Sequence, residues 1–169
     1  MRAFCRDLST SVPDVVRVNR GKMSMDAVAE KAIELDANRV VLVERWHGGP
    51  GKINLFRVSS TGLKPIPPLM LLSEIRLRRE FEEGTRRLRS SVITVEPKTS
   101  ELERIAGNLS NYFGLPVLTL DEASEHHRVS MHFSFNSSQH TQIMFMLLER
   151  MVEIGPRVTL SKLIWEEQK

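Results

Sequence analysis

This sequence contains almost no cysteine, no long apolar run and no strong net charge. The only cysteine among the 169 residues is Cys5, which excludes an internal disulfide and a cysteine-rich zinc site and fits a reducing compartment. No apolar run approaches the length of a membrane span, and no charged leader followed by an apolar core indicates an export signal. We therefore expect a cytoplasmic protein without a membrane partner.

The charge balance is mild, but it is uneven along the chain. Lys and Arg number 24 against 21 Asp and Glu, a net charge of +3 that does not by itself predict a nucleic-acid partner. Residues 1–22 hold five cations and only two acids. The cations are Arg2, Arg6, Arg17, Arg20 and Lys22. The length suits a single domain over residues 1–169.

Residues 15–43 predict a strand, a helix and a second strand in succession. The β-branched residues Val15, Val16 and Val18 favour a strand, and a turn at residues 19–22 follows. Ser24 suits the N-cap of a helix whose apolar positions recur at helical spacing, namely Met25, Val28, Ala29, Ala32 and Ile33. The apolar run 40–43 is typical of a strand covered on both faces. This order predicts two parallel strands with a right-handed crossover.

Such a crossover would put the turn at residues 19–22 at the carboxyl end of a strand and at the start of a helix. Backbone N–H groups, Arg20 and Lys22 would then converge on an anion, for which a phosphate is the obvious candidate. A second interpretation stays open, in which Asn19 and Gly21 only form a turn and the two cations are solvated.

Other segments of the first half also have identifiable patterns. Residues 2–12 place Phe4, Cys5, Leu8 and Val12 on one face of a helix, with Arg2, Arg6 and Asp7 away from it. The glycine-rich residues 48–52 predict a hairpin loop, and their spacing does not fit a phosphate-binding P-loop. Prolines at 65, 67 and 68 restrict residues 69–72 to an edge strand or an extended segment. Six arginines between residues 76 and 89 fit either a solvated, self-paired face or an RNA-binding edge.

The second half repeats the order of the first. We expect a strand at 92–95, then a helix capped by Thr99 or Ser100 that ends at Gly114, and then a strand at 116–118. Ser100 with Glu103 fits a capping box. A hairpin of residues 129–135 and 142–148 and a last strand at 158–165 follow. Residues 6–18 and 107–120 align as a weak internal repeat, which predicts two similar halves, about 1–90 and 91–169, and a strand upstream of Met1.

Catalytic and metal-binding patterns are absent from the sequence. His126, His127, His132 and His140 form no helical His-x-x-x-His pair and have no cysteine partner. There is no Ser/His/Asp constellation, no nucleophile elbow and no paired carboxylates in an evident cleft. We therefore expect a protein that is not an enzyme and that needs no cofactor or metal.

Several segments together resemble the Brix-domain family of ribosome-biogenesis proteins, in particular its short archaeal members. The matching segments, in chain order, are FCRDL (4–8), VNRGKMS (18–24), ERWHGGPGKI (44–53), IRLRREF (75–81) and EIGPRVTL (153–160) with the closing KLIW (162–165). Two departures stand out. The family's opening strand with its Thr-Ser-Arg-rich loop is not found before the first helix, and Gly48-Gly49-Pro50 replaces the common Gly-Asn-Pro.

The resemblance implies an α/β fold of two pseudo-repeated halves of mixed sheet with helices, similar to the anticodon-binding domain of class II aminoacyl-tRNA synthetases, with the first strand missing. It also implies a role in binding ribosomal RNA precursors during their processing and assembly. Family members are not known as enzymes, in agreement with the absence of a catalytic pattern.

The predicted RNA contacts follow from the charges and from this resemblance. Arg2, Arg6, Arg20 and Lys22 are expected to form one cationic corner that engages phosphates, and Asn19 to shape the turn or meet a ribose or base. The hairpin would add Arg45, His47 and Lys52, and the second half Arg157 beside its Gly-Pro turn. Two alternatives stay open: a protein-interaction module of a pre-ribosomal particle with other assembly proteins as partners, and a nucleotide-dependent enzyme that uses the turn at 19–22.

Overall fold

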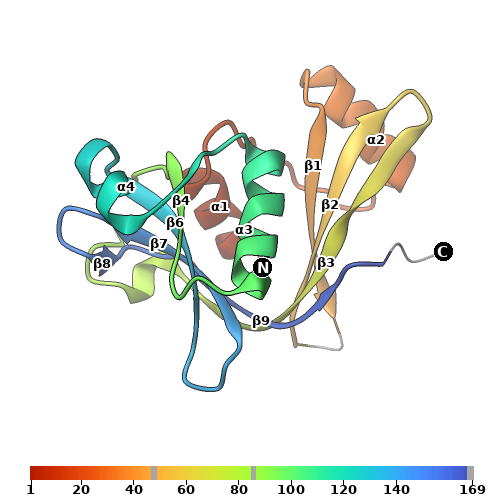
Figure 1. The fold of residues 1–169 in the computed structure, drawn as a ribbon. Helices are drawn as coiled ribbons and strands as arrows, with labels where there is room; N and C mark the ends of the chain where they lie inside the picture. The colour runs from red at the N-terminus through yellow and green to blue at the C-terminus, as the bar shows by residue number, and fades with distance from the viewer. Residues whose placement is uncertain (47–48, 85–86, 167–169) are drawn as a thin grey trace. The chain divides into compact units, whose positions relative to one another are not determined.

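The computed structural model describes residues 1–46, 49–84 and 87–166. Within these residues the chain forms four α-helices and a mixed sheet (Figure 1). Its strands follow the hydrogen-bonded order β1-β2-β3-β9-β7-β6-β4-β5, and β8 pairs with β7. The predicted α/β class with a mixed sheet is confirmed. The likeness to anticodon-binding domains stays a prediction.

The chain divides into two compact units. Unit 1 comprises Met1–Arg17 and Ser73–Leu160, and unit 2 comprises Val18–Leu72 and Ser161–Lys169. Two long strands, β3 (Gly62–Arg76) and β9 (Arg157–Ile164), contribute residues to both. The units do not follow the half-repeat boundary near residue 90, and the assignment of the chain to one domain stays a prediction.

Unit 1 contains most of the helices. Its elements are α1 (Arg2–Ser11), a 3-10 turn η1 (Arg78–Glu80), β4 (Val92–Val95), α3 (Ser100–Phe113), β5 (Val117–Leu118), α4 (Leu120–His126), β6 (Val129–Phe135), β7 (Thr141–Leu147) and β8 (Val152–Glu153). Strand β4 is parallel to both β5 and β6, whereas β6 and β7 form an antiparallel hairpin. The strand, helix and strand predicted for residues 92–118 are therefore confirmed, and so is the hairpin that follows.

Helix α3 shows why the sequence prediction works in this part of the chain. The Thr99 hydroxyl accepts the Leu102 N–H, and Gly114 ends the helix in the left-handed conformation at φ +69°. Its apolar side buries Leu102 and Ile105 completely, and the helix packs against β4, β5 and β6. The cap is Thr99 itself, so the alternative capping box at Ser100 is wrong.

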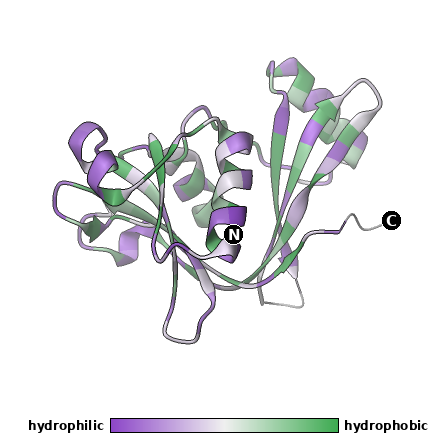
Figure 2. Ribbon diagram, in the orientation of Figure 1, coloured by the Kyte–Doolittle hydropathy of each residue, from purple (hydrophilic) through white to green (hydrophobic). Residues whose placement is uncertain are grey.

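Helix α4 was not predicted. Its start is fixed by a capping box in which Thr119 accepts the Glu122 N–H and the Glu122 carboxylate accepts the Thr119 N–H. Figure 2 shows this helix as mainly hydrophilic, and Ala123 is its one fully buried residue, in a cluster with Val92 and Leu148. Such a short, polar helix carries too little apolar periodicity to be recognised in the sequence.

Unit 2 is built on α2 (Met25–Glu34), β1 (Arg39–Trp46), β2 (Gly49–Ser59) and β3. The Ser24 hydroxyl caps α2 by accepting the Ala27 N–H, as predicted, and α2 packs against β2. Strands β1 and β2 form the predicted antiparallel hairpin, and β2 pairs antiparallel with β3. Ile33, one of the apolar positions of the predicted helix, is 63% exposed, and the helix fully buries only Ala29 and Ala32.

The parallel crossover predicted for the first half is wrong. Residues 15–20 are not a strand, and Val16 is 73% exposed. Among the described strands, β1 pairs only with β2, and it does so antiparallel. The β-branched residues favour an extended backbone, but strand formation also needs a partner, which this segment does not have among the described residues. Consequently, the turn at 19–22 does not lie at the carboxyl end of a strand.

Of the two predictions for residues 69–72, an edge strand or an extended segment, the edge strand is wrong. The long strand β3 runs through the prolines and lies between β2 and β9. The pairing of β2 with β3 shifts register between Ile53 and Leu55, so Pro67 and Pro68 fall where the ladder is interrupted. An irregularity thus accommodates residues that cannot donate a backbone hydrogen bond.

A close packing contact in unit 1 involves Phe81 and Gly155. Gly155 has φ +66°, and a Cβ atom added to it would lie 2.5 Å from Cδ2 of Phe81 and 3.0 Å from Cα of Arg78. Only glycine therefore fits this position, both for its backbone and for its contacts.

Replacement of Gly155 by Ala is expected to lower the free energy of unfolding by about 2–4 kcal/mol, because backbone strain adds to a clash with a packed ring. Gly114→Ala is the matched control, since Gly114 has φ +69° and a Cβ atom added to it would meet no heavy atom within 4 Å. Urea unfolding measures both. Equal losses in the two variants would contradict a role for the Phe81 contact.

Candidate nucleic-acid interface

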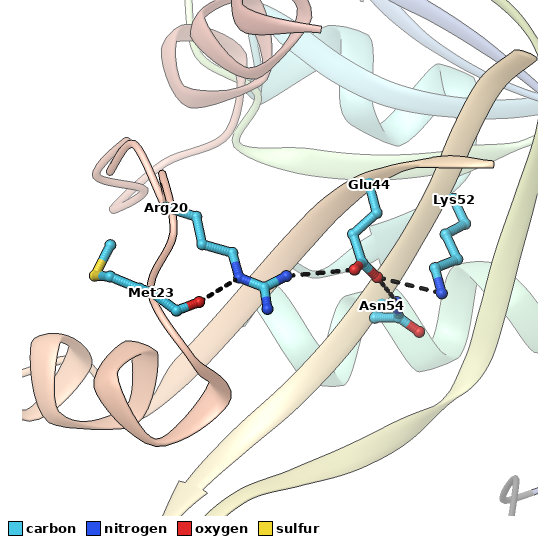
Figure 3. Close-up of polar contacts among 5 residues, drawn as sticks. All are labelled: Arg20, Met23, Glu44, Lys52 and Asn54. Atoms are coloured by element: carbon cyan, nitrogen blue, oxygen red, sulfur yellow. Dashed lines mark hydrogen bonds and ion pairs between the residues drawn. The ribbon is translucent and has the colours of Figure 1, made fainter. Parts of the chain in front are cut away.

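Three side chains of unit 2 meet at the carboxylate of Glu44 (Figure 3). They are Arg20, Lys52 and Asn54, and we call the four residues together the Glu44 cluster. The Glu44 carboxylate lies 3.3 Å from Arg20 Nη1 through one oxygen and 3.3 Å from Lys52 Nζ through the other. Asn54 Nδ2 donates a hydrogen bond of 2.9 Å to that second oxygen. Two cations and one amide thus share a single acid.

The hairpin of β1 and β2 supplies three of the four residues of this cluster. Glu44 of β1 is directly opposite Lys52 of β2, and Asn54 lies opposite Leu42 on the same face. Arg45 lies where the register of β1 with β2 shifts, between Glu44 and Trp46. Arg45 is exposed and forms no ion pair with a described residue.

The turn before α2 supplies Arg20. The Met23 N–H donates to the Arg20 carbonyl at 3.0 Å, and Gly21 permits this turn with φ +55°. Arg20 Nε donates to the Met23 carbonyl at 3.0 Å, which directs the guanidinium toward Glu44. The predicted turn is present, although its hydrogen bond closes over residues 20–23.

The cluster and its surroundings have a positive net charge. Arg20, Lys22 and Lys52 carry three positive charges against one on Glu44, a balance of +2. Lys22 is exposed and forms no ion pair with a described residue, and Asn19 is exposed as well. Because the ion pairs are only partly buried, they add little to stability, but they hold two cationic side chains in defined positions. Phosphate oxygens are the ligands that such a surface suits.

The remaining predicted contacts are distributed differently. Arg2 and Arg6 are exposed on α1, which belongs to unit 1, whereas Arg20 and Lys22 belong to unit 2. The single cationic corner therefore stays a prediction. His47 lies outside the described residues.

Arg157 is held by contacts within the protein, with Glu153 and with Phe81. Its guanidinium forms a double hydrogen bond with the Glu153 carboxylate and lies 5.6 Å from the centre of the Phe81 ring. The hydrogen bonds to Glu153 raise the pKa of Arg157 above its usual value, although partial burial opposes the shift. The role of Arg157 as a phosphate contact stays a prediction; its charge, like that of Arg20, is paired with a carboxylate.

The arginine-rich segment also contains a buried guanidinium. Arg78 is 5% exposed, donates from Nε to the Gly84 carbonyl at 3.2 Å and from Nη1 to Thr10 at 3.0 Å. Its backbone N–H donates to Asp7, which is buried rather than turned away from the core as predicted. Burial lowers the pKa of Arg78, and the Asp7 charge opposes that shift. Because Arg78 is buried, both interpretations of the arginine-rich segment, a solvated face and an RNA-binding edge, are wrong for this residue.

Sequence reasoning missed Glu44, Asn54 and Trp46. Once the hairpin is recognised, a signal for Glu44 exists, since a carboxylate opposite a lysine is a favourable cross-strand pair. The loop length alone does not set that register, so the pair could not be assigned from sequence. The described residues contain no group of three or more His, Cys, Asp or Glu side chains suited to a metal ion, and no described helix is long and apolar enough to cross a membrane.

Comparison with known proteins adds a family relationship. No protein-family model matches the chain. A probable Brix domain-containing ribosomal biogenesis protein of Aeropyrum pernix is 32% identical over 95 residues, which cover 56% of this chain and 53% of that protein. A protein of the same name from Sulfurisphaera tokodaii is 29% identical over 82 residues, 47% of each chain. The resemblance to the Brix-domain family is confirmed.

The chain spans about half the length of these Brix-domain relatives in the alignments. The crystal structure of a probable ribosomal biogenesis protein from Aeropyrum pernix K1 superposes with a TM-score of 0.76 at 22% identity. It covers 96% of this chain and 91% of its own. At this identity, the likeness concerns the fold.

His132, a candidate metal ligand by residue type, is instead part of a buried polar network in unit 1. Its Nδ1 lies 2.8 Å from the Thr94 hydroxyl, which in turn lies 3.0 Å from the Ser130 hydroxyl. Burial lowers the pKa of His132 below its usual 6.5, while the charges of Glu96 and Glu153 oppose the shift. The folded protein therefore favours the neutral imidazole.

Stability is expected to fall as the pH drops through about 6.5, because the unfolded chain then binds a proton that the folded His132 resists. In His132→Asn this part of the pH dependence disappears, whereas His140→Asn, at an exposed position, keeps it. Urea unfolding at about pH 7.5 and about pH 5.5 measures the difference. An unchanged pH dependence in His132→Asn would rule out this assignment.

Proposed function

We propose that this protein acts in ribosome biogenesis as an RNA-binding assembly factor that takes part in the processing of ribosomal RNA precursors. The names of the archaeal Brix-domain relatives support the role in ribosome biogenesis. The observation that carries the RNA-binding part is the Glu44 cluster, in which Arg20 and Lys52 are held on one side of a hairpin and Lys22 is exposed nearby in sequence.

Phosphate is the ligand that this surface suits best. Arg20 uses Nε and Nη1 for Met23 and Glu44, and its Nη2 donors form no hydrogen bond with the described residues. Lys52 has donors beyond its contact with Glu44, and Lys22 is exposed. These donors can approach successive phosphates without reading the bases, so binding would depend strongly on salt and weakly on sequence.

A second function, contact with another protein of a pre-ribosomal particle, is favoured by one observation. Helix α2 and its C-cap expose Ile33 and Leu35, which are 63% and 44% accessible. Exposed large apolar residues close together are typical of contact surfaces, although two residues form only a small patch. This function predicts no dependence on the cations of the Glu44 cluster.

The RNA-binding proposal is tested by Arg20→Ala combined with Lys22→Ala. Loss of two phosphate contacts is expected to make the slope of log affinity against log salt shallower by about 1.4 for single-stranded RNA, and to weaken binding similarly for all sequences. Fluorescence anisotropy with labelled ribosomal RNA fragments measures both effects. The double variant should retain its fold, because Glu44 keeps Lys52 and Asn54 as partners.

Arg57→Ala combined with Lys64→Ala is the matched control. These two exposed cations lie opposite each other in β2 and β3 and carry the same total charge. The control is expected to keep the salt slope of the wild type. If the two double variants behaved alike, the effect would come from net charge alone and the proposed interface would be wrong.

A further inference from the structure

Trp46 is a large aromatic residue at the end of the β1–β2 hairpin that lies only partly buried. It ends strand β1 and is 44% exposed, whereas the core of unit 2 consists of smaller side chains such as Leu55 and Met70. A tryptophan ring has a large apolar surface, and the exposed part of this one is available to a ligand. The indole is therefore not a core residue of unit 2.

The indole lies beside the Glu44 cluster. Lys52 Nζ is 5.1 Å from the centre of the Trp46 ring and 3.3 Å from the Glu44 carboxylate. Trp46 follows Glu44 on β1 across an irregularity in the β1–β2 pairing, so the contact with Lys52, rather than the alternation of side chains along the strand, places its ring at the cluster. Unit 2 thus carries an aromatic ring next to Lys52, one of the cations proposed to bind phosphates.

This combination is typical of a site for unpaired nucleic acid. Cations that follow the backbone, with an aromatic ring on which a base stacks, give affinity for single strands without sequence preference. A duplex does not offer its bases to such a ring, because they are already stacked and paired, and the deep groove of A-form RNA is too narrow for side chains to read. An indole beside a lysine therefore distinguishes between the two forms of RNA.

We infer that Trp46 stacks on an unpaired base of the RNA whose phosphates contact Arg20 and Lys52, so that the ligand is single-stranded rather than duplex RNA. The inference depends on the proposed function, since it names the form of RNA that the same site takes. It adds a contact that salt does not weaken, in contrast to the phosphate contacts.

Trp46→Ala and Trp46→Phe test this inference in the full chain, with an unstructured RNA of about twelve nucleotides and a duplex of the same sequence as probes. For Trp46→Ala we expect affinity for the single strand to fall about fivefold or more, with the salt slope unchanged. Trp46→Phe keeps a ring and should recover most of that loss. The wild type should bind the duplex more weakly than the single strand, and both variants should bind the duplex with the same affinity as the wild type.

A second measurement reports on the ring itself. The chain has two tryptophans, so Trp165→Phe leaves Trp46 as the only one. Its emission is expected to be quenched when the single strand binds, as stacking requires, and circular dichroism checks that each variant is folded.

The outcomes separate the inference from the function on which it rests. Binding of the single strand by Trp46→Ala at wild-type affinity, equal losses for single strand and duplex, or unchanged Trp46 emission on binding would each overturn the stacking role. Equal losses would mean that Trp46 acts only by positioning Lys52. If the wild type bound neither RNA, the proposed function would fail as well.

Discussion

The proposed interface of unit 2 depends on the contact between the Glu44 carboxylate and two cations. Arg20 comes from the turn before α2 and Lys52 from the opposite strand of the hairpin, so one acid joins segments that are 24 residues apart. The gain in stability is small, because these groups are partly hydrated. The larger consequence is geometric: flexible cationic side chains are held on one face of the sheet, next to Trp46, before any ligand arrives.

The segments that resemble the Brix-domain family separate into two groups with different roles. In unit 1, the segments 4–8, 75–81 and 153–160 meet around Arg78 and Phe81: Asp7 accepts the Arg78 N–H, and Gly155 packs against the Phe81 ring. In unit 2, the segments 18–24 and 44–53 contain Arg20, Glu44 and Lys52. The first group maintains packing, and the second offers charge to solvent.

Local signals predicted much of the fold. The Ser24 cap, the glycine end of α3 and both hairpins follow from residues close in sequence, and all were confirmed. The predictions that failed concern features that depend on residues distant in the sequence. The extended residues 15–18 have no neighbouring strand among the described residues, and the burial of Arg78 depends on Asp7, which is 71 residues away. In the candidate site, cations were identified by type and proximity in sequence, but their ion pairs depend on strand register and could not be foreseen.

Replacement of Glu44 by Gln tests the central claim most directly, with the affinity for single-stranded RNA measured over a series of salt concentrations. Gln keeps an oxygen that accepts from Arg20, so the side chain of Arg20 stays in place while the negative charge that competes with phosphate is removed. The account predicts binding roughly threefold tighter at low salt, with an advantage that shrinks as salt screens the charges. Unchanged or weaker binding by a variant that unfolds at the wild-type temperature would contradict it.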